Sequence, residues 1–222
     1  MRLAVALVAG SVAFALLKGS YGPALLLAPG DVLGRLWLWQ PLTYAFIETS
    51  PMGVIFGALI LWQLGGALEQ AWGSRRMLAF LLGTTVLAGV LTTALSLVLG
   101  PLVLMRFEGG MAMGLTAWVA FGLTLGRTGT NFWGLPVSGN VLALIGAGFV
   151  FLEGAFYGWL RIVPSAIALL LTVVYLRVGG PHLWWLQFQS WRLQRRLRGR
   201  SKHLKVVAPD RNTRGDSDRY LH

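Results

Sequence analysis

Few side chains in this sequence could take part in chemistry, and the glutamates are the most informative of them. The four in the sequence are Glu48, Glu69, Glu108 and Glu153. Acid catalysis of the aspartyl type needs two facing carboxylates, and these positions match no known pairing. Glu153 stands out because it lies inside an apolar stretch, where an ionisable group is costly and is a functional candidate by default. The alternative is that Glu153 lies near the outer end of that stretch, partly hydrated, and pairs with Arg161 or Arg106.

Residues for nucleophilic or metal chemistry are scarce. All three histidines, His182, His203 and His222, follow residue 181, and the chain contains no cysteine. A serine or threonine nucleophile needs a base within hydrogen-bond reach, and residues 1–181 offer no histidine for that role. There is no His-Glu-x-x-His sequence and no clustered set of ligands. The sequence therefore predicts neither a bound metal nor a cofactor.

The composition is that of a membrane protein with several spans. Hydrophobic residues make up 55% of the chain, charged residues 12%, and the mean hydropathy is +0.64. This composition is too apolar for a soluble domain of this length. Stretches with few charges that approach the ~20 residues of a helical span occur at 3–17, 51–68, 77–104, 110–126, 137–160 and 162–178. The sequence thus predicts an all-α membrane protein with six transmembrane helices.

The distribution of lysine and arginine predicts the orientation. If both termini are cytoplasmic, the inner loops and the tail hold fifteen of these residues and the outer loops four. This asymmetry follows the positive-inside rule. Arg75 and Arg76, adjacent in a short inner loop, are the strongest single anchor. We expect an integral multi-pass protein with cytoplasmic termini, and a bacterial inner membrane as its location.

The composition changes sharply after residue 180, which predicts a transmembrane domain at 1–180 and a basic cytoplasmic tail at 181–222. Trp184, Phe188 and Trp191 have helical spacing and are followed by a run of arginines. An amphipathic helix lying in the inner headgroup layer would place these rings in lipid and would set the arginines against anionic headgroups. The arginines expected to contact lipid are Arg192, Arg195 and Arg196. The alternative is a positive-inside stop signal with a disordered end, and nothing in the tail resembles a nucleic-acid recognition module.

Glycines recur at four-residue spacing inside the predicted spans. The pairs are Gly53 with Gly57, Gly110 with Gly114, Gly122 with Gly126, and Gly154 with Gly158. Such pairs let helix backbones approach closely in lipid. Because 110, 114, 122 and 126 fall on one face, we expect the fourth span to be a buried central helix.

The stretch from Trp39 to Arg76 resembles the core of the rhomboid intramembrane proteases. Rhomboids show a Trp and a Leu-Thr pair before an aromatic-x-His, then His-x-x-x-Asn opening the second helix, then Gly-x-x-x-Glu-x-x-x-Gly-Ser after it. The matching residues are Trp39, Leu42, Thr43 and Phe46 in the first part, and Gly65, Glu69, Gly73 and Ser74 in the last. An alignment without gaps to this rhomboid pattern places Glu48 at the position of the first histidine, Gly53 at that of the oxyanion-binding histidine and Gly57 at that of the asparagine.

The resemblance implies that the catalytic positions are vacant. Rhomboids carry their serine in Gly-x-Ser-Gly at the start of the fourth helix, and the matching stretch 109–114 places Ala112 there, or Met111 after a one-residue slip. Arg161 stands near the position of the catalytic histidine. Thr116 is the only hydroxyl nearby, one helical turn further on. Neither Ala112 nor Met111 can attack a carbonyl carbon.

The resemblance therefore implies a six-helix rhomboid-like bundle without protease activity, like the derlins and iRhoms, which bind transmembrane segments of client proteins without cutting them. It assigns structural roles to Trp39, Glu69, Gly73 and Arg75, and the glycine spacing adds packing roles for Gly110 and Gly114. Two alternatives remain open. An active rhomboid-family serine protease would need the missing serine and histidine, and a small transporter or channel would need a polar path, for which only Glu153 qualifies.

Overall fold

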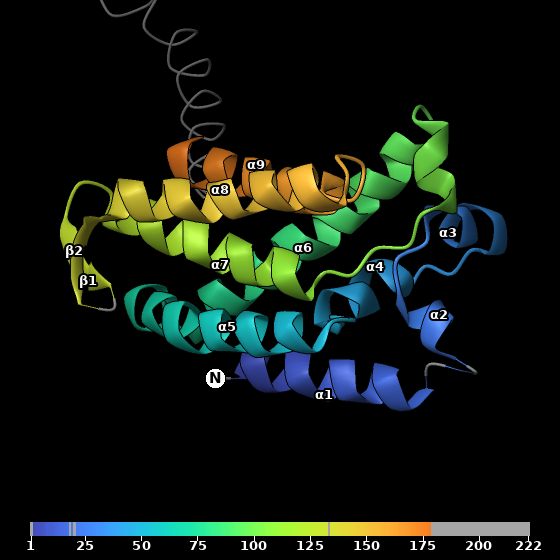
Figure 1. Cartoon of the computed structure of the whole chain (residues 1–222), viewed down its shortest axis with the longest axis horizontal. Coiled ribbons are helices and arrows are strands. Elements are labelled where there is room, and N and C mark those ends of the chain that lie inside the picture. The colour runs from blue at the N-terminus through green and yellow to red at the C-terminus, as the bar shows by residue number, and fades with distance from the viewer. Residues whose placement is uncertain (1, 18, 20, 133, 179–222) are drawn as a thin grey trace, which may run out of the picture. The chain divides into compact units, whose positions relative to one another are not determined.

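The computed structural model of the chain describes residues 2–17, 19, 21–132 and 134–178. Within this part, six helices of at least sixteen residues form a bundle and alternate in direction from one to the next (Figure 1). They are α1 (Arg2–Leu17), α5 (Pro51–Trp72), α6 (Ser74–Ser96), α7 (Gly110–Leu125), α8 (Gly139–Tyr157) and α9 (Val163–Val178). The expectation of an all-α chain is thus confirmed in its main part, since the described residues are mostly helical.

Five of the six predicted stretches coincide with a helix to within a few residues, and the stretch 77–104 does not. Helix α6 ends at Ser96, and a separate 3-10 helix, η2 (Gly100–Leu104), follows it. The break precedes Pro101, a residue that lacks the N–H needed to continue a helix.

The lengths divide the helices into two groups. In the described part, α5, α6 and α8 are long and apolar enough to cross a membrane by themselves, whereas α1, α7 and α9 are shorter apolar helices. Sixteen residues extend about 24 Å, less than the ~30 Å of a typical hydrocarbon core. Three described helices could thus cross a membrane by their length and composition, and the number of spans stays a prediction.

The structure also contains a short β-hairpin, so the expectation of a purely α-helical chain is wrong at one point. Strands β1 (Gly129–Phe132) and β2 (Leu135–Ser138) pair antiparallel between α7 and α8, with Phe132 opposite Leu135. Gly134 has φ +87°, a conformation that glycine adopts at little cost and that a two-residue hairpin turn requires.

The connection from α1 to α5 folds into short helices rather than an open loop. These are α2 (Gly22–Leu25), α3 (Pro29–Arg35), α4 (Gln40–Thr43) and the 3-10 helix η1 (Tyr44–Phe46). The first three each have proline in their first turn, where its fixed φ suits a helix start. Leu27 pairs with Phe107 through two backbone hydrogen bonds. This pairing ties the connection to the segment that leads into α7.

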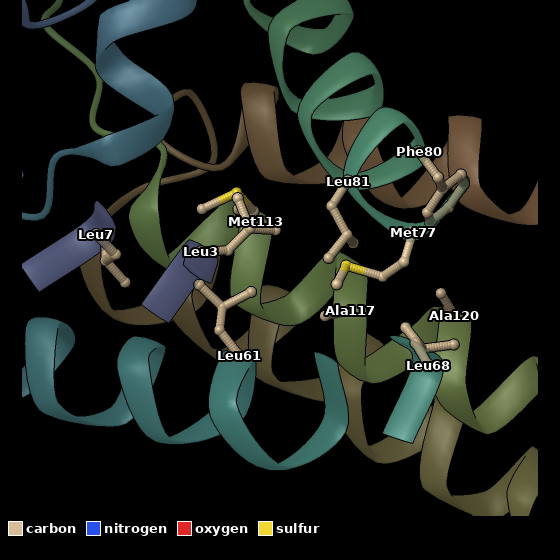
Figure 2. Packing of buried hydrophobic residues seen from close by; sticks show 10 residues of the cluster. All are labelled: Leu3, Leu7, Leu61, Leu68, Met77, Phe80, Leu81, Met113, Ala117 and Ala120. Atoms are coloured by element: carbon tan, nitrogen blue, oxygen red, sulfur yellow. The ribbon is translucent and has the colours of Figure 1, made fainter. Parts of the chain in front are cut away.

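Buried apolar side chains from four helices meet in the largest core cluster (Figure 2). Its members come from α1, α5, α6 and α7: Leu3, Leu7, Leu61, Leu68, Met77, Phe80, Leu81, Met113, Ala117 and Ala120. Every residue of α7 from Ala112 to Ala120 is buried. Helix α7 also packs against α5, α8 and α9, so it is the central helix of the bundle.

Glycines set the closest helix crossings. A Cβ atom on Gly114 would lie 3.6 Å from Cα of Gly57, where α7 meets α5. A Cβ atom on Gly122 would lie 2.6 Å from the backbone nitrogen of Ala143 in α8. Gly126 has a different role, because it ends α7 with φ +60°. Small residues on α7 therefore allow its two neighbours to approach closely.

Candidate functional site

A cavity of about 910 Å³ lies beside α7, bordered by α5 and α8. In Figure 1, α7 runs between these two helices. Both α5 and α8 pack extensively on α7 but barely on each other. The cavity therefore occupies the space that α5 and α8 leave open along the central helix.

The walls of this cavity are largely apolar and face outwards. Met52 and Phe56 on α5 are 65% and 50% exposed, and Leu152 and Phe156 on α8 are 50% and 80% exposed. Exposed side chains of this size would contact lipid tails or another apolar surface in a membrane. The cavity is thus a groove that is accessible from the side of the bundle.

Polar and charged groups line one end of the cavity. They come from the segments before α5 and α7, from the last turns of α8, from the connection to α9 and from the first turn of α9: Glu48, Thr49, Ser50, Arg106, Glu108, Glu153, Arg161 and Ser165. The residues from the middles of the helices, such as Leu59, Leu115 and Phe149, are mostly apolar. The site is therefore amphipathic along its length.

The carboxyl group of Glu48 lies at the start of α7 and is held on several sides. The backbone N–H of Met111 donates to Oε2 at 3.0 Å, and the hydroxyl of Ser50 donates to Oε1 at 3.4 Å. The backbone N–H of Glu48 donates to Oγ of Ser11 at 3.0 Å. The first N–H groups of a helix lack partners within the helix and favour a negative charge. Glu48 therefore supplies an N-terminal cap to α7 from a distant part of the chain.

Gly53 makes room for this carboxyl group. A Cβ atom at position 53 would lie 2.6 Å from Cδ of Glu48 and 2.6 Å from Oγ of Ser50. The backbone N–H of Gly53 donates to Oγ of Ser50 at 2.9 Å, so Ser50 is the N-cap of α5. The lack of a side chain at position 53 thus leaves the space that the carboxyl group of Glu48 occupies.

Burial is the main cause that raises the pKa of Glu48 from 4.5 to about 7, and the negative charge of Glu108 raises it further. The backbone N–H groups of Met111 and Ser50 lower the pKa, and the charge of Glu153 adds a smaller upward contribution. Only 6% of Glu48 is exposed, in keeping with the dominant effect of burial. Its carboxyl group therefore changes charge near neutral pH.

Glu108 and Glu153 occupy the same end of the cavity in different settings. Oε2 of Glu108 accepts a hydrogen bond from the backbone N–H of Thr49 at 2.8 Å. Glu153 lines the cavity with Arg106 and Arg161, but among the described residues no ion pair joins it to either arginine. Arg161 acts on Glu153 by its charge rather than by a direct ion pair, and the expected partly exposed position of Glu153 is confirmed.

The structure brings together most positions that the rhomboid resemblance singled out. Glu48, Gly53, Ala112 and Arg161 all line the cavity. Gly57 lies behind it, where a Cβ atom would be 3.0 Å from Cδ2 of Leu7. Ala112 itself is only 2% exposed.

The possible nucleophile Thr116 is fully buried in α7, and within the described part of the chain its hydroxyl has no hydrogen-bond partner. No group of three or more acidic or histidine side chains in that part could share a metal ion. The arrangement offers hydrogen-bonding groups and an apolar wall rather than an activated nucleophile.

The residues expected to have structural roles lie outside the cavity. Nε1 of Trp39 donates to the carbonyl oxygen of Ala24 at 3.0 Å, a hydrogen bond between two parts of the α1–α5 connection. Glu69 accepts a hydrogen bond from the hydroxyl of Ser74 across the α5–α6 turn, where Gly73 has φ +82°. Arg75 is exposed in the first turn of α6.

The glycines expected to pack have close neighbours. A Cβ atom on Gly110 would be 3.0 Å from Cβ of Glu48 and 3.2 Å from the carbonyl oxygen of Ile47, and Gly114 faces Gly57. The six tail residues expected to contact lipid, from Trp184 to Arg196, lie outside the described residues.

Sequence reasoning missed the parts of the site that depend on contacts between distant segments. No local sequence pattern indicates that Ser11 and the Met111 N–H contact Glu48, because each lies more than thirty residues from Glu48 in the sequence. Ser50 could have been found, because serine directly before Pro51 is a typical start of a helix.

Comparison with known proteins gives one match. No curated protein and no solved structure matches the chain. Because residues 1–178, which contain the whole bundle and its cavity, match the family described as "Eukaryotic integral membrane protein (DUF1751)", the chain belongs to that family of integral membrane proteins.

Proposed function

We propose that this protein binds a membrane-spanning segment of a partner protein in the cavity between α5 and α8, and that it does not cut that segment. The observation that supports this proposal is the cavity itself. Its volume is about 910 Å³ and its walls are apolar side chains of α5 and α8, several of them exposed. A groove of this kind can take an apolar segment from the surrounding bilayer while its polar end contacts the segment's more polar terminus.

The groups at the start of α7 support binding rather than cleavage. Serine-type cleavage needs an activated nucleophile and donors for the oxyanion. Ala112 has no nucleophilic atom, and the Met111 N–H is already bonded to the carboxyl group of Glu48. The chain's histidines all follow residue 181. The rhomboid-like relationship and the lack of protease activity form part of the same proposal.

A transporter or channel is the weaker alternative. It requires a polar path along the bundle, whereas the charged lining groups of this cavity gather at one end. Its middle is bordered by residues such as Leu115, Phe149 and Leu152. The lining favours an apolar occupant over an ion or a polar solute.

Photo-crosslinking from α8 tests the proposal. Leu152 lines the cavity, and Leu144 lies two turns earlier on the same helix, 71% exposed and outside the cavity lining. With benzoylphenylalanine at each position in native membranes, we expect a discrete protease-sensitive adduct from Leu152 and only lipid adducts from Leu144. Lipid adducts alone from both positions, or the same protein adduct from both, would contradict specific binding in the cavity.

The orientation belongs to the proposal as well. The family description names eukaryotes and so gives no support to the expected bacterial inner membrane. We propose that the hairpin end of the bundle faces the cytoplasm and the polar end of the cavity the opposite side, which the asymmetry of lysine and arginine supports.

Two introduced thiols test this orientation in a chain without cysteine. Gly129 in β1 and Gly100 in η2 are exposed and have no atom within 4 Å of a built Cβ. We expect Gly129→Cys to react with a membrane-impermeant maleimide only from the cytoplasmic side and Gly100→Cys only from the other side. Labelling of both from the same side would overturn the topology.

A further inference from the structure

Three glutamates from three separate elements line the polar end of the cavity. Glu48 precedes α5, Glu108 precedes α7, and Glu153 lies in the last turns of α8. The negative charges of Glu108 and Glu153 both raise the pKa of Glu48, as like charges do when they lie within range of one another. We call these three residues the acidic cluster.

The bundle does not compensate the acidic cluster with ion pairs. In the described part of the chain, no ion pair joins any of the three glutamates to a basic side chain. Arg106 and Arg161 line the same end of the cavity, but both are exposed, and a long exposed side chain keeps its charge in water or among headgroups. Because carboxylates that repel one another raise the free energy of the folded state, a cation supplied from outside would stabilise the cluster.

A buried hydroxyl group at the same end of the cavity also lacks a partner. Ser165, in the first turn of α9, lines the cavity and is only 7% exposed. Within the described residues its hydroxyl makes no hydrogen bond. A buried hydroxyl without a partner is costly, and an occupant of the cavity that offers a hydrogen bond would remove this cost. Ser165 therefore adds a neutral acceptor beside the carboxylates.

A basic side chain matches this set of groups. An ammonium or guanidinium group carries a positive charge and several N–H donors, which carboxylates and a hydroxyl can accept. A metal ion matches less well, since the described residues contain no group of three acidic or histidine side chains that could share one. The apolar lining of α5 runs from Met52 to Leu64, about 18 Å along the helix. The cavity thus combines a site for one cation with a long apolar wall.

We infer that the occupant of the cavity is a transmembrane helix with a lysine or arginine near the end that meets the acidic cluster, followed by about twelve apolar residues along α5. The inference rests on the proposed function and names the class of partner. In the proposed orientation this end of the helix is the non-cytoplasmic one, where basic residues are less frequent. The partners are therefore a restricted set of helices, those with a basic residue on the less usual side.

Three synthetic peptides test this charge rule with the purified full-length chain in phosphatidylcholine vesicles. Each is a Leu/Ala transmembrane helix with tryptophan and asparagine at both ends, and they differ in one residue near one end, which is Lys, Gln or Glu. Energy transfer from a labelled peptide to a dye on Gly129→Cys reports binding in a buffer with EDTA. We expect half-saturation at an about threefold to tenfold lower mole fraction for the Lys peptide than for the Gln peptide, as a partly buried ion pair provides. The Glu peptide should bind most weakly.

Variants of the cavity assign the preference to the acidic cluster. Glu153→Gln should reduce the preference for the Lys peptide. Glu153→Lys should weaken the Lys peptide further and strengthen the Glu peptide relative to the wild type, a gain that a misfolded protein would not show. The matched control is Asp31→Asn, which removes an acid of α3 outside the cavity lining and should leave the preference unchanged.

The outcomes separate the inference from the proposed function. Saturable but equal binding of the Lys and Gln peptides, or a Lys preference that both Glu153 variants leave intact, would overturn the charge rule and leave binding in the cavity standing. Tightest binding of the Glu peptide when calcium replaces EDTA would show that the cluster takes a metal ion instead. Absence of saturable binding by any of the three peptides would count against the proposed function as well.

Discussion

Gly122→Leu is expected to lower the free energy of unfolding by about 3 kcal/mol, because it would force α7 and α8 apart. A Cβ atom on Gly122 would lie 2.6 Å from both the nitrogen of Ala143 and the carbonyl oxygen of Gly139. Both are backbone atoms of α8, so no side-chain rotation can relieve the overlap. Thermal unfolding in detergent micelles would measure the loss.

The control for this substitution is Gly148→Leu, also in a membrane helix. A Cβ on Gly148 meets nothing within 4 Å, so leucine there should change the melting temperature little. Since α8 forms one wall of the cavity, Gly122→Leu should also reduce crosslinking from Leu152. A Gly122→Leu protein as stable as the Gly148→Leu protein would show that α7 and α8 do not cross at this point.

The second large effect is a dependence of stability on pH that comes from Glu48. Folding raises the pKa of this carboxyl group from 4.5 to about 7, so the folded state holds the proton more tightly than the unfolded state. The resulting stabilisation is fully present below pH 4.5 and is lost as the pH rises through about 7. Its size is about 3 kcal/mol, from 1.36 kcal/mol for each unit of pKa.

Glu48→Gln should remove this dependence, because the amide keeps an oxygen for the Met111 N–H but does not titrate. Between pH 5 and 8, the unfolding free energy of the wild-type protein should fall more steeply than that of the variant. Glu108→Gln should give an intermediate slope, since the charge of Glu108 contributes to the raised pKa. Parallel curves for wild type and Glu48→Gln would mean that Glu48 is not buried as described.

The positions of the helices could be predicted because long apolar stretches with few charges carry a direct signal of helical spans. The exceptions have local causes. The stretch that begins at residue 77 was extended too far because hydropathy continues past Ser96, although Pro101 already indicated a break. The hairpin at 129–138 was missed because it is short and lies between two strongly apolar helices.

The site was predictable only in part. The resemblance placed Glu48, Gly53 and Ala112 near one another, and all three line the cavity. The bond from the Met111 N–H to Glu48 joins residues 63 positions apart, and no local pattern encodes such a contact.

The central claim, that the cavity binds a transmembrane helix without cutting it, is tested most directly by the mass of a crosslinked adduct. The full-length chain with benzoylphenylalanine at position 152 would be incubated in vesicles with a Leu/Ala transmembrane peptide that has lysines at its ends, irradiated and analysed by intact mass spectrometry. The expected product is the chain plus one whole peptide, with free peptide uncut after prolonged incubation. An adduct that carries only a peptide fragment, or peptide cleavage that depends on the protein, would contradict the account.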